Sequence, residues 1–300
     1  MTANDEDSAT PPVAIGVALM VGGCALLTIN DAFMKAMIAD LPVGQVVSLR
    51  GLAGFLMLVA LSPLMGGVRA LRPRNLKTTL LLTALMLFNF FVFPIGLRHV
   101  PFADAIMLAY LSPLVVVMLS PWLLRETVGW RRWSAVGIGL AGAALVIEPF
   151  GGDLHPAILA PLAVAVMLGL RDTLTRRVIR GESALALVAM GMLGSGLAGL
   201  VTVPAGWHAL NALQTWQLLG SAAFLAVAHF CVLASFRYAD AAVMACLKYT
   251  SIIWAALLGW VFWGETLGLN DWVGSALIVF SGVLITLRTR RRPLIAGRVG

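Results

Sequence analysis

Two stretches of the sequence match each other. Residues 97–127 read LRHVPFADAIMLAYLSPLVVVMLSPWLLRET, and residues 236–266 read FRYADAAVMACLKYTSIIWAALLGWVFWGET. They align without gaps, and the matched polar pairs are Arg98 and Arg237, Tyr110 and Tyr249, Ser112 and Ser251, Glu126 and Glu265, and Thr127 and Thr266. A shared apolar bias would pair leucine with leucine, but it does not pair arginine, tyrosine and glutamate. The match therefore indicates an internal duplication.

The duplication extends toward the start of each half. The segment from Asp31 to Lys35 matches the segment from Asp172 to Arg176, and Pro63 matches Pro204 at the same offset. A short insertion or deletion reconciles this offset with that of the longer match. The two copies therefore account for most of the chain.

The composition places this duplicated chain in a membrane. Of its 300 residues, 60% are hydrophobic and 12% are charged, and the mean hydropathy is +0.93. A soluble domain carries about 25% charged residues, so too few polar side chains are present to cover a surface in water. This excludes a soluble enzyme, a nucleic-acid binder and a disordered regulator. Basic loops on one side of a membrane explain the net charge of +7 without an acidic partner.

A helix that crosses a bilayer needs about 20 mostly apolar residues. Ten such runs are present, at 13–34, 43–64, 78–97, 104–123, 132–148, 156–175, 183–204, 216–235, 241–263 and 271–288. The sequence therefore predicts an all-α integral membrane protein with ten transmembrane helices. Its predicted parts are a polar cytoplasmic segment (1–12), a first five-helix repeat (13–148), a second one (156–288) and a basic cytoplasmic tail (289–300).

The basic residues predict the orientation. They cluster in every second loop, for example at Arg69 to Lys77 and at Arg125 to Arg132, and again in the tail from Arg288. Since cytoplasmic loops are enriched in lysine and arginine, both termini are predicted to be cytoplasmic in a cell inner membrane. Five spans per repeat is an odd number, so the second repeat is inverted relative to the first. Inverted repeats are typical of transporters, which bind substrate where the repeats meet.

The repeated segment, which closes in an apolar stretch followed by Glu-Thr, resembles the paired EamA domains of the drug/metabolite transporter superfamily. The resemblance implies a ten-span carrier of metabolites such as amino acids, S-adenosylmethionine or riboflavin. One departure is that Pro113 in the first copy faces Ile252 in the second. We therefore expect the two helices to bend differently.

Ionisable residues at membrane depth are costly, so those inside predicted spans are candidate functional residues. Asp31 can pair with Lys35, one helical turn away, or with Arg50 of the second span. If Arg50 instead faces a cavity, it suits a carboxylate or phosphate group of the substrate. Asn89 is suited to bond either a neighbouring helix or a ligand.

The second half adds His229, which suits either proton transfer or a simple hydrogen bond, and Lys248 beside Tyr249. Tyr110 and Tyr249 hold equivalent places in the two repeats and are expected to flank one cavity, although packing alone would also explain them. We predict substrate contacts at Arg50, Asn89, Tyr110, Lys248, Tyr249 and Trp254, and proton coupling or gating at Asp31, His229, Arg98 and Asp104. For Arg98 and Asp104, a role as helix-end charges at the membrane interface is the alternative and is favoured.

Motifs for catalysis, metal binding or nucleotide binding are absent from the sequence, including HExxH, GxSxG, GxxxxGK and CxxC. Glu126 and Glu265 close spans at opposite faces, which favours a role in clasping loops over paired-carboxylate chemistry. We therefore expect a secondary transporter without catalytic residues, metal or cofactor, as a monomer or homodimer in contact with membrane lipid. Uptake of a riboflavin-like vitamin is slightly favoured. The alternatives are an amino-acid exporter, an S-adenosylmethionine carrier, or a non-transporting membrane enzyme or assembly factor.

Overall fold

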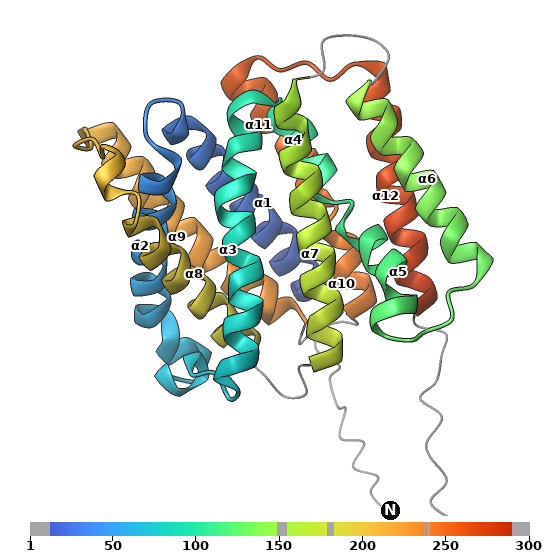
Figure 1. Ribbon diagram of the computed structural model, residues 1–300, viewed down its shortest axis with the longest axis horizontal. Coiled ribbons are helices and arrows are strands. Elements are labelled where there is room, and N and C mark those ends of the chain that lie inside the picture. The colour runs from blue at the N-terminus through green and yellow to red at the C-terminus, as the bar shows by residue number, and fades with distance from the viewer. Residues whose placement is uncertain (1–12, 149–154, 179–182, 237, 239–240, 290–300) are drawn as a thin grey trace, which may run out of the picture.

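A computed structural model describes residues 13–148, 155–178, 183–236, 238 and 241–289 (Figure 1). These residues form helices and no strands, as expected for an all-α protein. The first half holds α1 (Val13–Ile38), α2 (Val43–Leu61), α3 (Leu76–His99), α4 (Phe102–Ala109), α5 (Ser112–Leu123) and α6 (Trp130–Ile147). The second half holds α7 (Leu159–Val178), α8 (Ala184–Leu200), α9 (Ala212–Ser235), α10 (Ala241–Leu247), α11 (Thr250–Trp263) and α12 (Leu269–Thr289).

Within the described part, eight helical segments are long and apolar enough to cross a membrane. They are Val13–Ile38, Val43–Leu64, Leu76–His99, Phe102–Leu123, Pro156–Thr175, Ala212–Ser235, Val243–Trp263 and Leu269–Thr286. Large apolar side chains on their outer faces are more than half exposed, including Leu56, Ile253, Trp260 and Phe262. Because apolar surface of this extent is stable in lipid and not in water, the chain is a multi-pass membrane protein.

Two predicted spans fall short of that criterion. The helix at Leu185–Leu200 is apolar but shorter, and α6 begins with two arginines, Arg131 and Arg132, that lower its hydropathy. The predicted segments 1–12 and 289–300 lie outside the described residues, apart from Thr289, and so does Arg237.

Local sequence signals fix several helix ends. Pro42 and Pro101 immediately precede α2 and α4, where proline's fixed φ suits the first turn. Asn75 caps α3 by accepting a hydrogen bond from the backbone N–H of Thr78, and Asn211 forms a capping box with Gln214 at the start of α9.

The fourth and ninth predicted spans are each interrupted at the same repeat position. Tyr110 and Leu111 separate α4 from α5, and Lys248 and Tyr249 separate α10 from α11. At both breaks the backbone closes turns between residues three apart, for example from Leu111 N–H to the carbonyl of Leu108 and from Tyr249 N–H to the carbonyl of Cys246. Both helices therefore break, although a proline, Pro113, follows the break only in the first copy. That the two helices bend by different angles stays a prediction.

The packing of the helices repeats when the two halves are exchanged (Figure 1). α1 packs on α9 in the way that α7 packs on α3, and α11 contacts α1 as α5 contacts α7. Two contacts are their own counterparts, because each joins a helix to its repeat equivalent. These are α2 with α8 and α6 with α12. The core therefore lies where the halves meet.

Glycines bring two of these helix pairs close together. A Cβ on Gly142 of α6 would lie 2.7 Å from the carbonyl oxygen of Gly274 on α12, and one on Gly274 would lie 2.6 Å from that of Gly142. On α8, a Cβ on Gly199 would lie 2.7 Å from the carbonyl oxygen of Gly44 on α2. Small residues let these helices approach to backbone contact, which is how helices associate in lipid.

Candidate functional site

A cavity of about 1130 Å³ lies between the two halves. Its lining comes from most of the helices and includes charged, polar and aromatic side chains. The charged ones are Asp31, Arg50, Glu126, Arg132, Arg171, Asp172 and Lys248. Glu126 is exposed to solvent, so the cavity reaches the surface at the end of the bundle where α5 gives way to α6.

The opposite end of the bundle is closed by Glu265, which follows α11. Its Oε1 lies 2.6 Å from Nζ of Lys35 on α1, and its Oε2 accepts a 2.7 Å hydrogen bond from the backbone N–H of Phe102 at the start of α4. Lys35 Nζ also donates to the carbonyl of Val100 and lies 4.9 Å from the centre of the Trp263 ring. This confirms that Glu265 clasps a loop. It also shows that Lys35 pairs with Glu265 and not with Asp31.

Asp31 and Arg50 are instead joined through Asn30. One Arg50 nitrogen, Nη1, donates to Asn30 Oδ1 at 3.3 Å, and Asn30 Nδ2 donates to Asp31 Oδ1 at 3.0 Å. Ser221 Oγ on α9 donates to the same Asn30 oxygen at 2.7 Å. Arg50 is 4% exposed, and its guanidinium lies 6.0 Å from the centre of the Phe90 ring. Asn30 therefore holds a buried cation and a carboxylate in place on one wall of the cavity.

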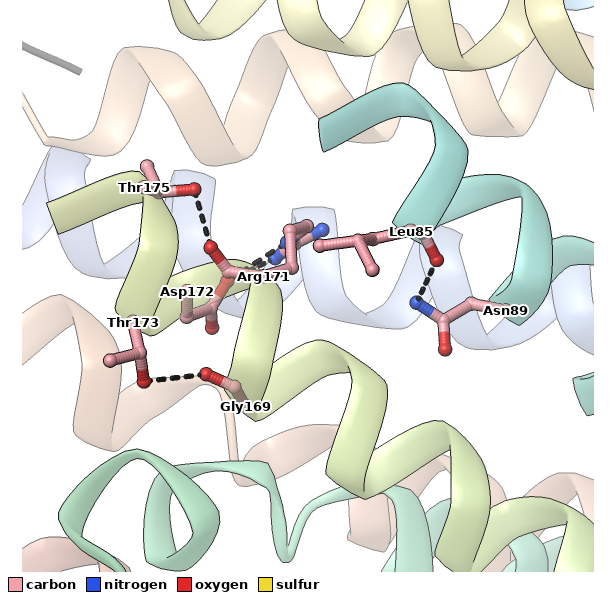
Figure 2. A network of polar contacts seen from close by, with 7 residues as sticks. All are labelled: Leu85, Asn89, Gly169, Arg171, Asp172, Thr173 and Thr175. Atoms are coloured by element: carbon pink, nitrogen blue, oxygen red, sulfur yellow. Dashed lines mark hydrogen bonds and ion pairs between the residues drawn. The ribbon is translucent and has the colours of Figure 1, made fainter. Parts of the chain in front are cut away.

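The matching wall in the second half is built differently. Arg171 precedes Asp172 on α7, and its Nε and Nη2 both donate to Asp172 Oδ1, at 2.9 and 2.5 Å (Figure 2). The carboxylate of Asp172 is thus neutralised by its own neighbour in the chain.

Asn89, near the middle of α3, and His229, in the last third of α9, each bond their own helix. Asn89 Nδ2 donates to the carbonyl of Leu85 (Figure 2), and His229 Nδ1 lies 2.8 Å from the carbonyl oxygen of Leu225. Asn89 Oδ1 is buried without a hydrogen-bond partner among the described residues and belongs to a side chain that lines the cavity.

The two repeat-matched tyrosines pack against each other at the helix breaks, and both line the cavity. The centres of the Tyr110 and Tyr249 rings are 5.5 Å apart. Tyr249 is 5% exposed, its hydroxyl has no partner within the described part of the chain, and that hydroxyl lies directly against the backbone of Gly282 on α12. Lys248, at the same break, is exposed in the cavity lining.

Seven of the predicted site residues therefore line the cavity: Asp31, Arg50, Asn89, Tyr110, His229, Lys248 and Tyr249. Trp254 does not, because it packs beside Met20, Cys24 and Met244 instead. Arg98 lies outside the cavity as well.

Asp104 lines a separate pocket of about 380 Å³ near the end that Glu265 closes. His99 and His155 stack there with ring centres 4.8 Å apart, beside Glu148 and Asp271. Asp104 is thus separated from the other predicted site residues.

Sequence reasoning did not identify Ser221 as part of the site. It is one of two serines in α9, a mostly apolar helix, and no spacing signal distinguishes it from Ser235, which bonds its own helix.

Comparison with known proteins identifies relatives along the whole chain. The EamA-like transporter family matches residues 14–148 and again residues 155–287. A riboflavin transporter of Vibrio cholerae is 28% identical over 188 residues, which cover 62% of this chain and 63% of that protein. A pseudopaline exporter of Pseudomonas aeruginosa is 28% identical over 289 residues, 91% of this chain and 93% of that one.

Proteins of lower sequence identity also match most of this chain. An S-adenosylmethionine uptake transporter of Rickettsia prowazekii is 22% identical over 230 residues, covering 76% of this chain and 77% of that protein. A solved crystal structure shares the fold with a TM-score of 0.63 at 21% identity, covering 92% of this chain and 98% of the other.

Proposed function

The chain belongs to the EamA-like transporter family, and from that membership we propose that it is a secondary carrier of a small metabolite. The observation that carries the proposal is the cavity between the halves. It is closed at one end by the Lys35–Glu265 ion pair and reaches the surface at the other. A cavity accessible from one side at a time is what alternating access requires.

The proposed architecture has ten spans in two inverted five-helix repeats, with boundaries near 13–148 and 156–288. Eight spans meet the length and hydropathy criterion. The two others, α6 and α8, pack lengthwise on α12 and α2 inside the same bundle, which supports counting them as spans. The exchange of contacts between the halves and the paired helix breaks support the duplication.

The proposed location is a cell inner membrane, with both termini in the cytoplasm. The start of α1 and the end of α12 lie at the same end of the bundle (Figure 1), in keeping with an even number of spans. With this orientation the cavity opens to the cytoplasm, and the Lys35–Glu265 pair closes the outer end.

The proposed substrate is a small molecule with polar or charged groups and an apolar or ring-bearing part. Phe90, Phe93 and the two tyrosines supply aromatic surface, and Arg50 and Lys248 supply positive charge. Riboflavin, which the sequence slightly favoured, fits the aromatic surface, and S-adenosylmethionine and amino acids fit the charges. An enzyme or assembly factor is the competing class, and the family relationship favours a carrier over it.

Uptake into liposomes tests the proposal. Purified protein is reconstituted, and entry of labelled riboflavin, S-adenosylmethionine and amino acids is measured with and without a proton or sodium gradient. Protein-dependent entry of at least one compound, saturable and competed by the unlabelled form, is the expected result. Failure of every compound under every gradient would contradict the carrier function.

A further inference from the structure

We infer that Asp31, Asn30 and Arg50 form a binding site for a zwitterionic α-amino acid group, whose carboxylate binds Arg50 and whose ammonium binds Asp31. The inference rests on the proposed carrier function and names the class of substrate that the cavity takes. It starts from a difference between the two repeats.

Asp31 and Asp172 hold equivalent places in the duplication, and both line the cavity. The residue before Asp172 is Arg171, whose two nitrogens bind the carboxylate. The residue before Asp31 is Asn30, which carries no charge and donates to only one carboxylate oxygen. In the second half the carboxylate therefore binds a cation directly, whereas in the first half an uncharged amide stands between the carboxylate and the cation Arg50.

The charges of the first half make no direct ion pair in the described structure. The ion pairs found among the described residues are Lys35 with Glu265 and Arg171 with Asp172, so neither Asp31 nor Arg50 has an ion-pair partner there. Arg50 makes one hydrogen bond, to Asn30, and a guanidinium has five N–H donors. Oδ2 of Asp31 likewise has no hydrogen bond to a described residue, and both side chains line the cavity.

The spacing of these charges fits the two charges of an amino acid. A single amide, that of Asn30, separates the guanidinium from the carboxylate, and an α-amino acid holds its ammonium and carboxylate on one carbon. Bonds from Arg50 and Ser221 to Asn30 Oδ1 fix the amide so that its NH₂ faces Asp31. Because Arg50 is 4% exposed, water competes weakly for it, and a planar guanidinium binds a carboxylate through two parallel bonds.

The neighbouring side chains accommodate the rest of such a molecule. Phe90 lies against the guanidinium of Arg50, and Asn89, one position earlier on α3, also lines the cavity. Riboflavin lacks an amino acid group, whereas S-adenosylmethionine has one. The site therefore favours S-adenosylmethionine and free amino acids over riboflavin.

Binding is tested by calorimetry on the full-length protein, with the twenty common amino acids and S-adenosylmethionine as probes. The tightest binder is then compared with its decarboxylated and deaminated analogues. For phenylalanine these are phenethylamine and 3-phenylpropionate. Wild-type protein is expected to bind each analogue at least about tenfold more weakly, the loss typical of one hydrogen bond to a charged group.

Variants assign each charge to its partner. Asp31→Asn is expected to abolish the preference for the amino acid over the deaminated analogue while keeping the preference over the decarboxylated one, and Arg50→Gln the reverse. Asn30→Arg reproduces the arrangement at Arg171 and is expected to weaken binding of the amino acid at least about tenfold. Asp40→Asn and Arg72→Gln, exposed residues outside the cavity, serve as matched controls and retain wild-type binding.

The ratio between analogues is measured within one variant, so a general loss of folded protein does not imitate the expected result. The inference is wrong if no amino acid and no S-adenosylmethionine binds, or if each variant weakens all three compounds equally. Transport of riboflavin without binding of any amino acid would overturn the inference and leave the carrier function intact. Absence of transport for every compound would instead contradict the carrier function.

Discussion

Lys35 on α1 and Glu265 after α11 form an ion pair with Nζ 2.6 Å from Oε1, and both side chains are mostly buried. The same carboxylate accepts the first N–H of α4. One carboxylate thus links helices of both halves at the end where the cavity is closed. Its repeat counterpart, Glu126, is exposed at the end that the cavity reaches.

Breaking this pair is expected to open the closed end. Glu265→Gln leaves Lys35 without a counter-charge in a mostly buried position, which costs about 2–4 kcal/mol of stability. A cysteine placed in the cavity is then expected to react faster with a membrane-impermeant thiol reagent added from the Glu265 side. The combined variant Lys35→Met/Glu265→Gln is expected to recover part of the lost stability, and strictly additive losses would show that the pair is not coupled.

Removing the hydroxyl of Tyr249 tests whether this group contributes to packing or to substrate binding. It is buried and has no partner among the described residues, so Tyr249→Phe is expected to leave thermal stability unchanged or raise it by up to about 1 kcal/mol. If the hydroxyl binds substrate, the same variant lowers transport. A marked loss of stability in Tyr249→Phe would instead reveal a structural hydrogen bond. Gly282→Ala places a methyl group against this ring and is expected to destabilise the fold by about 1–3 kcal/mol.

Much of the fold could be predicted from the sequence, because each helix is marked by an apolar run and belongs to one of the two duplicated halves. The matched tyrosines predicted a shared position in the two halves, and the structure places both at helix breaks on one cavity. The break in the ninth span could not be foreseen, because no proline marks it there.

Side-chain partners were harder to predict than helices. Asp31 and Lys35 lie one turn apart, and their spacing suggested a pair. Helical spacing does not reveal that Glu265, remote in sequence, lies closer to Lys35. Trp254 lies in the predicted ninth span but beyond its break, on α11, which contributes no side chain to the cavity lining, and it packs beside Met20 and Met244. The sequence shows which charged residues are costly to bury in a membrane. Which of them contact each other depends on the tertiary packing.

The contact between α6 and α12 provides a test of close helix packing. Gly142→Val is expected to destabilise the protein by about 2–3 kcal/mol, because its side chain would displace the backbone of α12 at Gly274. Gly137, also on α6, has open space around its Cβ position. Gly137→Val is therefore the matched control and is expected to change the stability by no more than about 1 kcal/mol. Thermal unfolding in one detergent compares the two, and equal melting temperatures for both variants would contradict this contact.

Substitution of Lys248 is expected to change transport while leaving the stability of the protein almost unchanged. Its side chain is exposed in the cavity and has no ion-pair partner among the residues that the structure describes, so Lys248→Ala removes no internal contact of that kind. The free energy of unfolding, followed by thermal unfolding, is expected to change by no more than is typical of a surface substitution, about 0.5 kcal/mol. Transport of an anionic or zwitterionic substrate is expected to be abolished, because the cavity loses a cation beside Tyr249. Lys248→Arg keeps the charge and is expected to retain part of the rate, and wild-type transport by Lys248→Ala would remove Lys248 from the binding site.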